Sequence, residues 1–184
     1  MKLIVLLLSL GMFAFAQDVI TVDAAKSKLE WKGEKVTGAH NGTINIKEGS
    51  LQFDKDKLVG GAFKIDMTTI INLDLESEQW NKKLVDHLNS DDFFSTEKHP
   101  VADFQITSVA HKAGNMYSIT GDMTIKGITH AITFDAMVMK NKAEATILLD
   151  RTKWNVRYGS GKFFEGLGDR MIYDEFEMKV SLAY

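Results

Sequence analysis

The segment from Gly121 to Phe134 constrains the fold of this chain more than any other stretch. Its sequence, GDMTIKGITHAITF, alternates apolar and polar residues on both sides of a central Lys126-Gly127 pair. The apolar positions in and just before it are Ile119, Met123, Ile125, Ile128, Ile132 and Phe134. A period of two places such residues on one face of a strand, and the glycine permits a tight reversal. We therefore predict two antiparallel strands that share one buried face.

Similar alternation recurs along most of the chain. The C-terminal segment is the clearest example, because its apolar and polar residues alternate without a break from Glu175 to Leu182. The other predicted strands are centred on Leu29–Trp31 or span 43–53, 58–71, 101–110, 116–125, 128–139 and 143–150. About eight strands joined mostly by short turns favour an antiparallel meander that closes into a barrel.

Short turn motifs, most of them containing asparagine or glycine, interrupt or separate these predicted strands. Asn41-Gly42 predicts a hairpin turn that launches the strand beginning at Thr43, and Glu48-Gly49-Ser50 predicts a break within that strand. Ala113–Asn115 and Asn141-Lys142 predict two further turns.

Glu76–Ser90 is the one segment with helical periodicity. Its apolar stripe consists of Trp80, Leu84, His87 and Leu88, and charged residues occupy the opposite face. Asp74 or Ser77 could cap the start of this helix. We expect a single amphipathic helix that covers one end of the barrel.

The segment from Arg157 to Arg170 fits neither a strand nor a helix. It holds four glycines, and it carries Phe163, Phe164 and Leu167 between charged residues. Long loops in a compact domain tend to be functional or disordered. Because these apolar side chains are costly to leave in water, we expect the loop to fold over a barrel mouth. A surface loop with two tucked aromatic rings is the alternative.

The first residues have the pattern of a secretory signal peptide. A basic start at Lys2 is followed by an apolar run from Leu3 to Phe15, and Ala14-Phe15-Ala16 forms a small-x-small cleavage site. We expect cleavage after Ala16, a periplasmic or secreted location, and one domain over residues 17–184. No second long apolar segment follows, so we do not expect an integral membrane protein.

Composition narrows the partners further. The sequence has no cysteine, so stability must come from core packing and not from disulfides. The net charge is −3, which argues against nucleic acid as a main partner.

Catalytic motifs are missing from the sequence. There is no cysteine nucleophile and no Gly-x-Ser-x-Gly elbow, and Ser160 lies between glycines without a strand-to-helix context. The five histidines form no i, i+4 pair, which argues against a zinc site. The adjacent Asp91 and Asp92 are more typical of a turn. We therefore expect no enzyme, no metal and no cofactor.

Several short motifs in this order resemble the YceI-like family of bacterial periplasmic lipid-binding barrels. Gly121–His130 is similar to the family signature GDLTIKGVTK, and Asp86–Phe94 is similar to its HLKSxDFF segment. The remaining matches are Ser27-x-Leu29-x-Trp31, His40-x-Gly42, Pro100 with Phe104, Arg151 with Trp154 and Arg157-Tyr158-Gly159, and Ile172-Tyr173-Asp174. The segment 69–83 departs from the family, since it lacks the usual SIDT…R.D run.

This resemblance implies an all-β, extended lipocalin-like eight-stranded antiparallel barrel with one short α-helix covering an end. It also implies a long amphiphile as ligand, namely a polyisoprenoid, an isoprenoid quinone or a fatty acid or amide. Family members often form dimers, so a homodimer is an assembly open to this chain. The residues suit such a ligand as well, because methionines at 67, 116, 123, 137, 139, 171 and 178 could adapt to a flexible tail.

We predict a set of ligand-binding residues in the lumen and at its mouth. They are Trp31, Phe63, Met67, Trp80, Leu84, His87, Phe93, Phe104, Met123, Trp154, Arg157, Phe163 and Phe164. A polar head group would contact His87, Asp92, Arg151 or Arg157 at a mouth. Several of these residues also have an ordinary structural explanation. His87 could bond a backbone carbonyl, Arg157 could pair with Asp150 or Asp174, and Trp31 and Trp154 could be wall aromatics.

Two functions remain on the sequence alone. The first is an exported protein that carries or sequesters an amphiphile in an apolar lumen. The alternative is a non-catalytic structural or stress-related interaction barrel whose lumen is filled by side chains and whose loops contact another protein.

Overall fold

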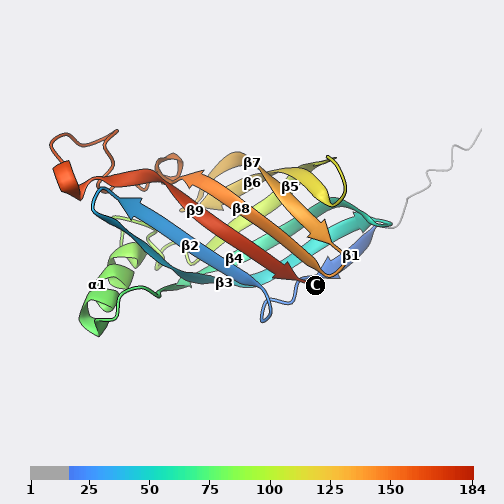
Figure 1. The fold of residues 1–184 in the computed structure, drawn as a ribbon, viewed down its shortest axis with the longest axis horizontal. Helices are drawn as coiled ribbons and strands as arrows, with labels where there is room; N and C mark the ends of the chain where they lie inside the picture. Colours follow the sequence, from blue (N-terminus) through green and yellow to red (C-terminus); the bar gives the residue numbers. More distant parts are fainter. Residues whose placement is uncertain (1–16) are drawn as a thin grey trace, which may run out of the picture.

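Nine strands and one α-helix make up the fold of residues 17–184, the part of the chain that the computed structural model describes (Figure 1). The strands are β1 (Asp18–Thr21), β2 (Lys28–Lys35), β3 (Gly38–Asp54), β4 (Lys57–Asn72), β5 (Val101–His111), β6 (Met116–Ile125), β7 (Ile128–Met139), β8 (Lys142–Asp150) and β9 (Ile172–Ala183). The predicted signal peptide, residues 1–16, lies outside the described residues.

The strands form one antiparallel sheet that closes on itself. Going around it, the order is β3, β2, β9, β8, β7, β6, β5 and β4, and a pairing between β3 and β4 completes the ring. The short β1 adds to the second half of β3, where Asp18 pairs with Phe53. Closure leaves no free edge among β2–β9. The predicted eight-stranded antiparallel barrel is confirmed.

The hairpin predicted within Gly121–Phe134 forms between β6 and β7. Ile125 pairs with Ile128, and the two residues between them are Lys126 and Gly127. Both have positive φ angles, 52° and 71°, as a tight two-residue hairpin turn requires.

The turn predicted at Asn41-Gly42 is wrong. Both residues lie inside β3, where Trp31 of β2 pairs with Gly42, and the β2–β3 reversal occurs at 36–37 instead. Gly42 allows β3 to approach β4 closely, because a Cβ there would lie 1.8 Å from the Ile71 carbonyl oxygen. The break predicted at 48–50 is also wrong, since β3 continues there with a shift of its register against β4. Pairing on both edges overrides the local turn preference of these residues.

The helix α1 (Glu78–Asn89) lies between β4 and β5 in the chain and at one end of the barrel (Figure 1). Ser77 is its N-cap, and the Ser77 hydroxyl accepts a hydrogen bond from the Trp80 N–H. Asp74 does not cap it and instead binds the backbone of β3. Among the residues described, no helix has the length and apolar character needed to span a membrane.

The other end of the barrel is filled. Val22, Phe53 and Tyr117 are buried there, and the Phe53 ring lies 6.0 Å from that of Tyr184. The Tyr184 hydroxyl donates a hydrogen bond of 2.6 Å to the Met139 carbonyl. We call these four residues, Val22, Phe53, Tyr117 and Tyr184, the closed end.

Candidate functional site

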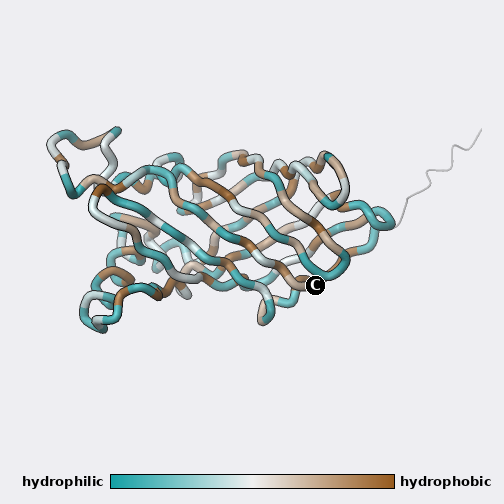
Figure 2. The backbone as a smooth tube through the Cα atoms, viewed as in Figure 1, coloured by the Kyte–Doolittle hydropathy of each residue, from teal (hydrophilic) through white to brown (hydrophobic). Residues whose placement is uncertain are grey.

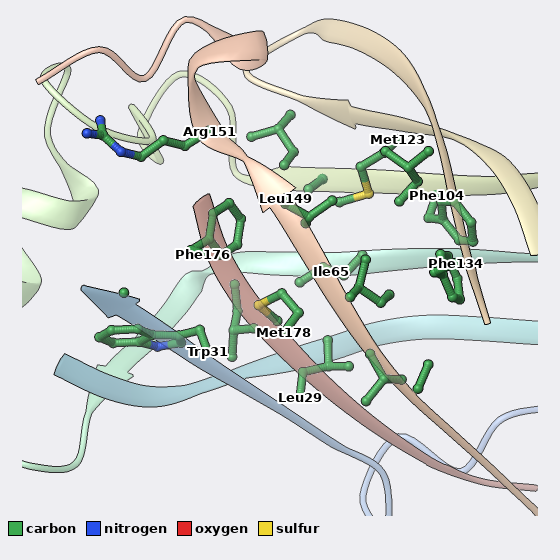
Figure 3. A pocket seen from close by; sticks show the side chains of 18 of the residues that line it. Leu29, Trp31, Ile65, Phe104, Met123, Phe134, Leu149, Arg151, Phe176 and Met178 are labelled. Carbon is green, nitrogen blue, oxygen red and sulfur yellow. The ribbon is translucent and has the colours of Figure 1, made fainter. Parts of the chain in front are cut away.

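The barrel encloses a cavity of about 280 Å³. Its lining comes from every strand from β2 to β9, together with Leu84 and Leu88 of α1. Figure 3 shows side chains such as Leu29, Ile65, Leu149 and Met178 converging on this space from different strands. Nearly all of the lining is hydrocarbon or thioether, so the site is suited to an apolar guest.

The inward direction of these side chains follows from strand alternation. On β9, Phe176, Met178 and Val180 line the cavity, whereas Glu177 and Lys179 between them do not. Hydropathy alternates in the same way along the strands in Figure 2. The lumenal side chains of β9 are only half-buried, although they face inward. They border the cavity, and Phe176 also packs against Phe94, with 6.4 Å between the ring centres.

The cavity opens at the end of the barrel where α1 lies. Polar residues occur in its lining mainly at this mouth, on the β2–β3 hairpin and at the start of β9. They include Glu34, Lys35, His40, Arg151, Tyr173 and Glu175. The site is therefore an apolar channel with polar groups at its opening.

Arg151 is buried at this mouth, but its guanidinium is fully engaged. Its three nitrogens donate hydrogen bonds to the carbonyls of Tyr173, Val156 and Ile172, at 2.9–3.1 Å. Asp174 lies 3.7 Å away. Burial lowers the pKa of Arg151, and the nearby carboxylates partly oppose this effect. Arg151 thus holds the start of β9 in place and has little capacity left for a ligand.

His40 has a free ring nitrogen at the same mouth. Its Nδ1 lies 2.8 Å from the Asp74 carboxylate, which also accepts hydrogen bonds from the Asn41 N–H and the Asn72 amide. Partial burial acts to raise the pKa of Asp74, but these hydrogen bonds outweigh it and the pKa lies below its ordinary value. Asp74 therefore stays ionised and orients the imidazole. No described residue donates to or accepts from His40 Nε2.

Seven of the predicted ligand-binding residues line the cavity. They are Trp31, Phe63, Met67, Leu84, Phe93, Phe104 and Met123. The other six lie outside its lining, namely Trp80, His87, Trp154, Arg157, Phe163 and Phe164. Whether the lining residues contact a ligand stays a prediction. Of the seven methionines, Met67, Met123 and Met178 reach the cavity.

Two of the outlying residues have structural roles. Trp154 is fully buried in the hydrophobic core, outside the cavity lining, and its indole N–H donates a 3.1 Å hydrogen bond to the Met123 carbonyl. The His87 ring packs edge-on against Phe93 and Tyr158, and its Nε2 lies 3.4 Å from Asp92. Neither side chain faces the lumen.

Arg157 does not form the ion pair considered from the sequence. Its guanidinium lies 4.5 Å from the centre of the Phe163 ring. Lys162 is the residue that pairs with both Asp150 and Asp174, at 2.9 and 3.2 Å.

The loop between the 3₁₀ helix Arg151–Trp154 and β9 does not cover the mouth. Phe163 and Phe164 are exposed, and the segment projects outward beside the start of β9 (Figure 1). The buried Ser160 organises it, because its carbonyl accepts hydrogen bonds from the N–H groups of Phe163 and Phe164. Both rings are exposed, so the expectation of tucked or covering aromatics is wrong.

Sequence reasoning missed several cavity residues. In the sequence, His40 stands out only as part of the His40-x-Gly42 motif. Phe134, Phe176 and Met178 line the cavity as well, and their alternation was visible in the sequence. Counting inward positions on every predicted strand would have found these three, whereas His40 required knowledge of the β3–β4 pairing.

Solved structures share this architecture. BcnA from Burkholderia cenocepacia superposes with a TM-score of 0.71 at 25% identity, covering 89% of this chain and 99% of that one. A polyisoprenoid binding domain from Saccharophagus degradans matches with a TM-score of 0.59 at 13% identity, covering 92% and 97% of the two chains. The second likeness concerns the fold alone.

Sequence relatives agree with the structural ones. A UPF0312 protein from Shewanella denitrificans is 36% identical over 95 residues, which is 52% of this chain and 47% of the relative. Protein YceI from Escherichia coli O157:H7 is 33% identical over 98 residues, 53% of this chain and 48% of that protein. The matched part thus spans about half the length of these relatives. The YceI-like domain model matches residues 20–184, and the chain therefore belongs to the YceI-like domain family.

Proposed function

We propose that this protein, after removal of its predicted signal peptide, carries or sequesters a single-chain amphiphile in the barrel lumen. The ligand classes are a polyisoprenoid, an isoprenoid quinone, or a fatty acid or amide. The observation that carries the proposal is the apolar cavity, closed at one end and open at the other. The function is one of binding, without a catalytic step.

The dimensions of the cavity favour a slender guest. Its volume of about 280 Å³ is near the lower end of the roughly 300–1,000 Å³ typical of small-molecule sites. An eight-stranded barrel has room for one narrow ligand at most. Met67, Met123 and Met178 can change rotamer to follow a flexible chain. A single prenyl or acyl tail fits these limits, whereas a lipid with two tails does not.

The affinity would come from burial of hydrocarbon. Each methylene taken from water into the lumen contributes about 0.8 kcal/mol before ordering costs. A tail of ordinary length therefore needs no specific polar contact in order to bind. The similarity of fold to a polyisoprenoid binding domain is consistent with this mode of binding.

We further propose that His40 contacts the head group. The Asp74 carboxylate accepts a hydrogen bond from the Nδ1–H, so in this tautomer Nε2 is an acceptor at the mouth. Glu34 and Glu175 also line this opening, but Lys35 and Arg151 offset their charges, so the choice of head group rests on Nε2. An alcohol or an amide, which can donate to Nε2, suits the site better than a carboxylate.

The alternative function, an interaction barrel, required a lumen filled by side chains. The cavity argues against that version, since Phe176, Met178 and Val180 face open space. Phe163 and Phe164 are exposed on the surface of the protein.

Native mass spectrometry and lipid extraction of the chain, purified without detergent, test the proposal. We expect one bound amphiphile per protein. Ala145 lines the lumen, so Ala145→Trp should place an indole there and lower occupancy at least about tenfold, by loss of tail burial. Thr146 lies next to it on the outer face, and Thr146→Trp is the matched control that should keep full occupancy.

One result would overturn the carrier function. If the purified chain holds no lipid, and if added geranylgeraniol and oleamide also fail to bind, the lumen is not a ligand site. An Ala145→Trp chain that binds as well as the parent would lead to the same conclusion.

A further inference from the structure

We propose that the open end of the barrel docks onto the surface of a lipid bilayer, so that an amphiphile passes between membrane and lumen without crossing water. This inference rests on the proposed function and adds the partner from which the ligand comes.

The first observation is a ring of exposed apolar side chains around the mouth. We define this mouth rim as Val36, Ile71, Leu73, Trp80, Tyr158, Phe163, Phe164 and Tyr173. Each is between 43% and 58% exposed. The segments that bear them are the β2–β3 hairpin, the end of β4, α1, the loop before β9 and the start of β9, and all lie at the same end in Figure 1. A soluble protein rarely gathers this much exposed hydrocarbon without a partner for it.

The segments of the rim are joined to one another. The Val36 N–H donates to the Met171 carbonyl, which ties the hairpin to the loop before β9. The Tyr158 ring packs 4.5 Å from that of His87 on α1. The Leu73 N–H donates to the Asn41 carbonyl of β3. The rim is therefore one connected surface.

The apolar surface of the lumen continues into the rim. On α1, Leu88, Leu84 and Trp80 follow each other at intervals of four residues and share one face. The first two line the cavity, whereas Trp80 is exposed outside it. Tyr173 belongs to both, because it lines the cavity and is also exposed. These residues make the apolar surface continuous from the lumen to the rim, beside the charged residues that line the mouth.

This continuity points to a bilayer as the occupant. A partner protein would cover the rim, but it would not supply hydrocarbon to the lumen. A bilayer does both, since its acyl region accepts apolar side chains and stores the amphiphiles that the lumen suits. The mixture of Trp, Tyr and Phe in the rim is also that of residues that favour the membrane–water interface.

Charges near the rim indicate the kind of bilayer. Lys83 Nζ lies 5.0 Å from the centre of the Trp80 ring, and Arg157 lies over Phe163. Such cations can extend to the lipid head groups while their aromatic neighbours insert. In the same loop Glu165 and Asp169 offset Arg157 and Arg170, and Lys162 is paired with Asp150 and Asp174. We therefore infer docking to zwitterionic lipid, driven by apolar insertion and only weakly dependent on salt.

Flotation with phosphatidylcholine vesicles tests this inference on the full purified chain. The rim variant Trp80→Ser/Phe163→Ser/Phe164→Ser should reduce partitioning at least about tenfold, because three apolar groups no longer leave water. The matched control is Val19→Ser/Val59→Ser/Leu148→Ser, which removes three exposed apolar side chains elsewhere on the barrel. The control should float like the parent. Circular dichroism of all three proteins shows whether each is folded.

Tryptophan fluorescence gives a second readout that needs no variant. Trp154 is buried and Trp31 is partly buried, so Trp80 is the exposed indole of the described residues. Brominated phosphatidylcholine in the vesicles should quench its emission if it inserts. Raising the salt concentration should change the quenching by less than about twofold, in contrast to binding through charge.

The outcomes separate docking from carriage. A parent chain that holds lipid but neither floats nor shows quenching overturns the docking inference and leaves the carrier function intact. A parent chain that floats but holds no lipid overturns the carrier function and leaves docking to the bilayer intact. If the rim mediates only self-association, sedimentation will show a dimer that the rim variant loses, without vesicle binding, and this result also overturns docking.

Discussion

At the closed end of the barrel Phe53 is 8% exposed, whereas at the open end Leu73 and Trp80 are 58% and 57% exposed. The same strands run between these two ends. At the closed end, the segment before β2 crosses the barrel, and the Asp23 N–H donates to the Ala183 carbonyl. At the open end the crossing segment is a helix of which no residue is fully buried.

This difference shows how one barrel can be both stable and hollow. Aromatic rings and a tyrosine hydroxyl with its own hydrogen bond complete the core at the closed end. Towards the open end, the inward side chains of β9 are only half-buried and border the cavity. The fold thus takes its stability from one end and leaves the other for binding.

Truncation of phenylalanine should separate the two ends most clearly. Phe53→Ala removes a buried ring from the closed end and should lower the free energy of unfolding by about 3–5 kcal/mol. Phe176→Ala removes a ring that already borders the cavity, so we expect a cost of less than about 2 kcal/mol. Urea unfolding of the ligand-free proteins measures both values. Equal costs would show that the lumen is as tightly packed as the closed end.

Arg151 should be the exception at the open end, because it is structural. Arg151→Met leaves three carbonyls without their donor, and we expect a loss of about 2–4 kcal/mol in the free energy of unfolding. Arg157→Met, in contrast, removes a guanidinium that lies over an exposed ring and should cost less than about 1 kcal/mol. If the two variants unfold alike, Arg151 does not hold β9 in place.

Substitution of Gly42 should test how closely β3 contacts Ile71 and Trp31 near the open end. Gly42→Ala brings a Cβ to within 1.8 Å of the Ile71 carbonyl oxygen and 2.7 Å of Trp31 Cζ2. We expect a cost of about 1–3 kcal/mol from overpacking, together with a shift of the Trp31 emission. Gly114→Ala is a useful comparison, since open space surrounds that position but its φ of +58° adds backbone strain alone. A Gly42→Ala chain with parental emission would contradict the close contact.

Replacement of Asp74 should have the smallest effect on the free energy of unfolding, and only at a pH where its carboxyl group is ionised. Hydrogen bonds hold its pKa below the ordinary value of 3.8, so the folded state favours the carboxylate. Its contribution to stability is therefore present above that pH and is lost as the pH falls through the lowered pKa. Asp74→Asn should lower the free energy of unfolding at pH 7, measured by urea, by less than about 1 kcal/mol, and the difference should shrink below pH 3.8. A difference that is constant with pH would exclude this role for the carboxylate.

Local patterns were enough to predict the barrel. Alternation along each segment and the turn at Lys126-Gly127 identified the eight strands of the closed ring, but not the short β1. The resemblance to the YceI-like family, confirmed by the match over residues 20–184, rested on short motifs spread over the chain.

The site was less predictable, because its residues depend on contacts between distant segments. His40 reaches the mouth through a pairing with Asp74, 34 residues away. Trp154 is a reasonable lumen residue by type, but its hydrogen bond to Met123 holds it in the core outside the cavity lining. Phe163 and Phe164 look costly to expose, and only the folded loop shows that both rings are exposed.

The amino-acid sequence by itself determined that this chain forms an antiparallel barrel with an apolar inner face, because a period of two assigns every strand residue to one face or the other. It does not determine how far along the barrel a residue lies or what stands opposite it. The tertiary structure decided that Phe53 and Tyr184 meet and fill one end. It also decided that Met178 faces open space, since only the closure of β3 onto β4 sets the distances across the lumen.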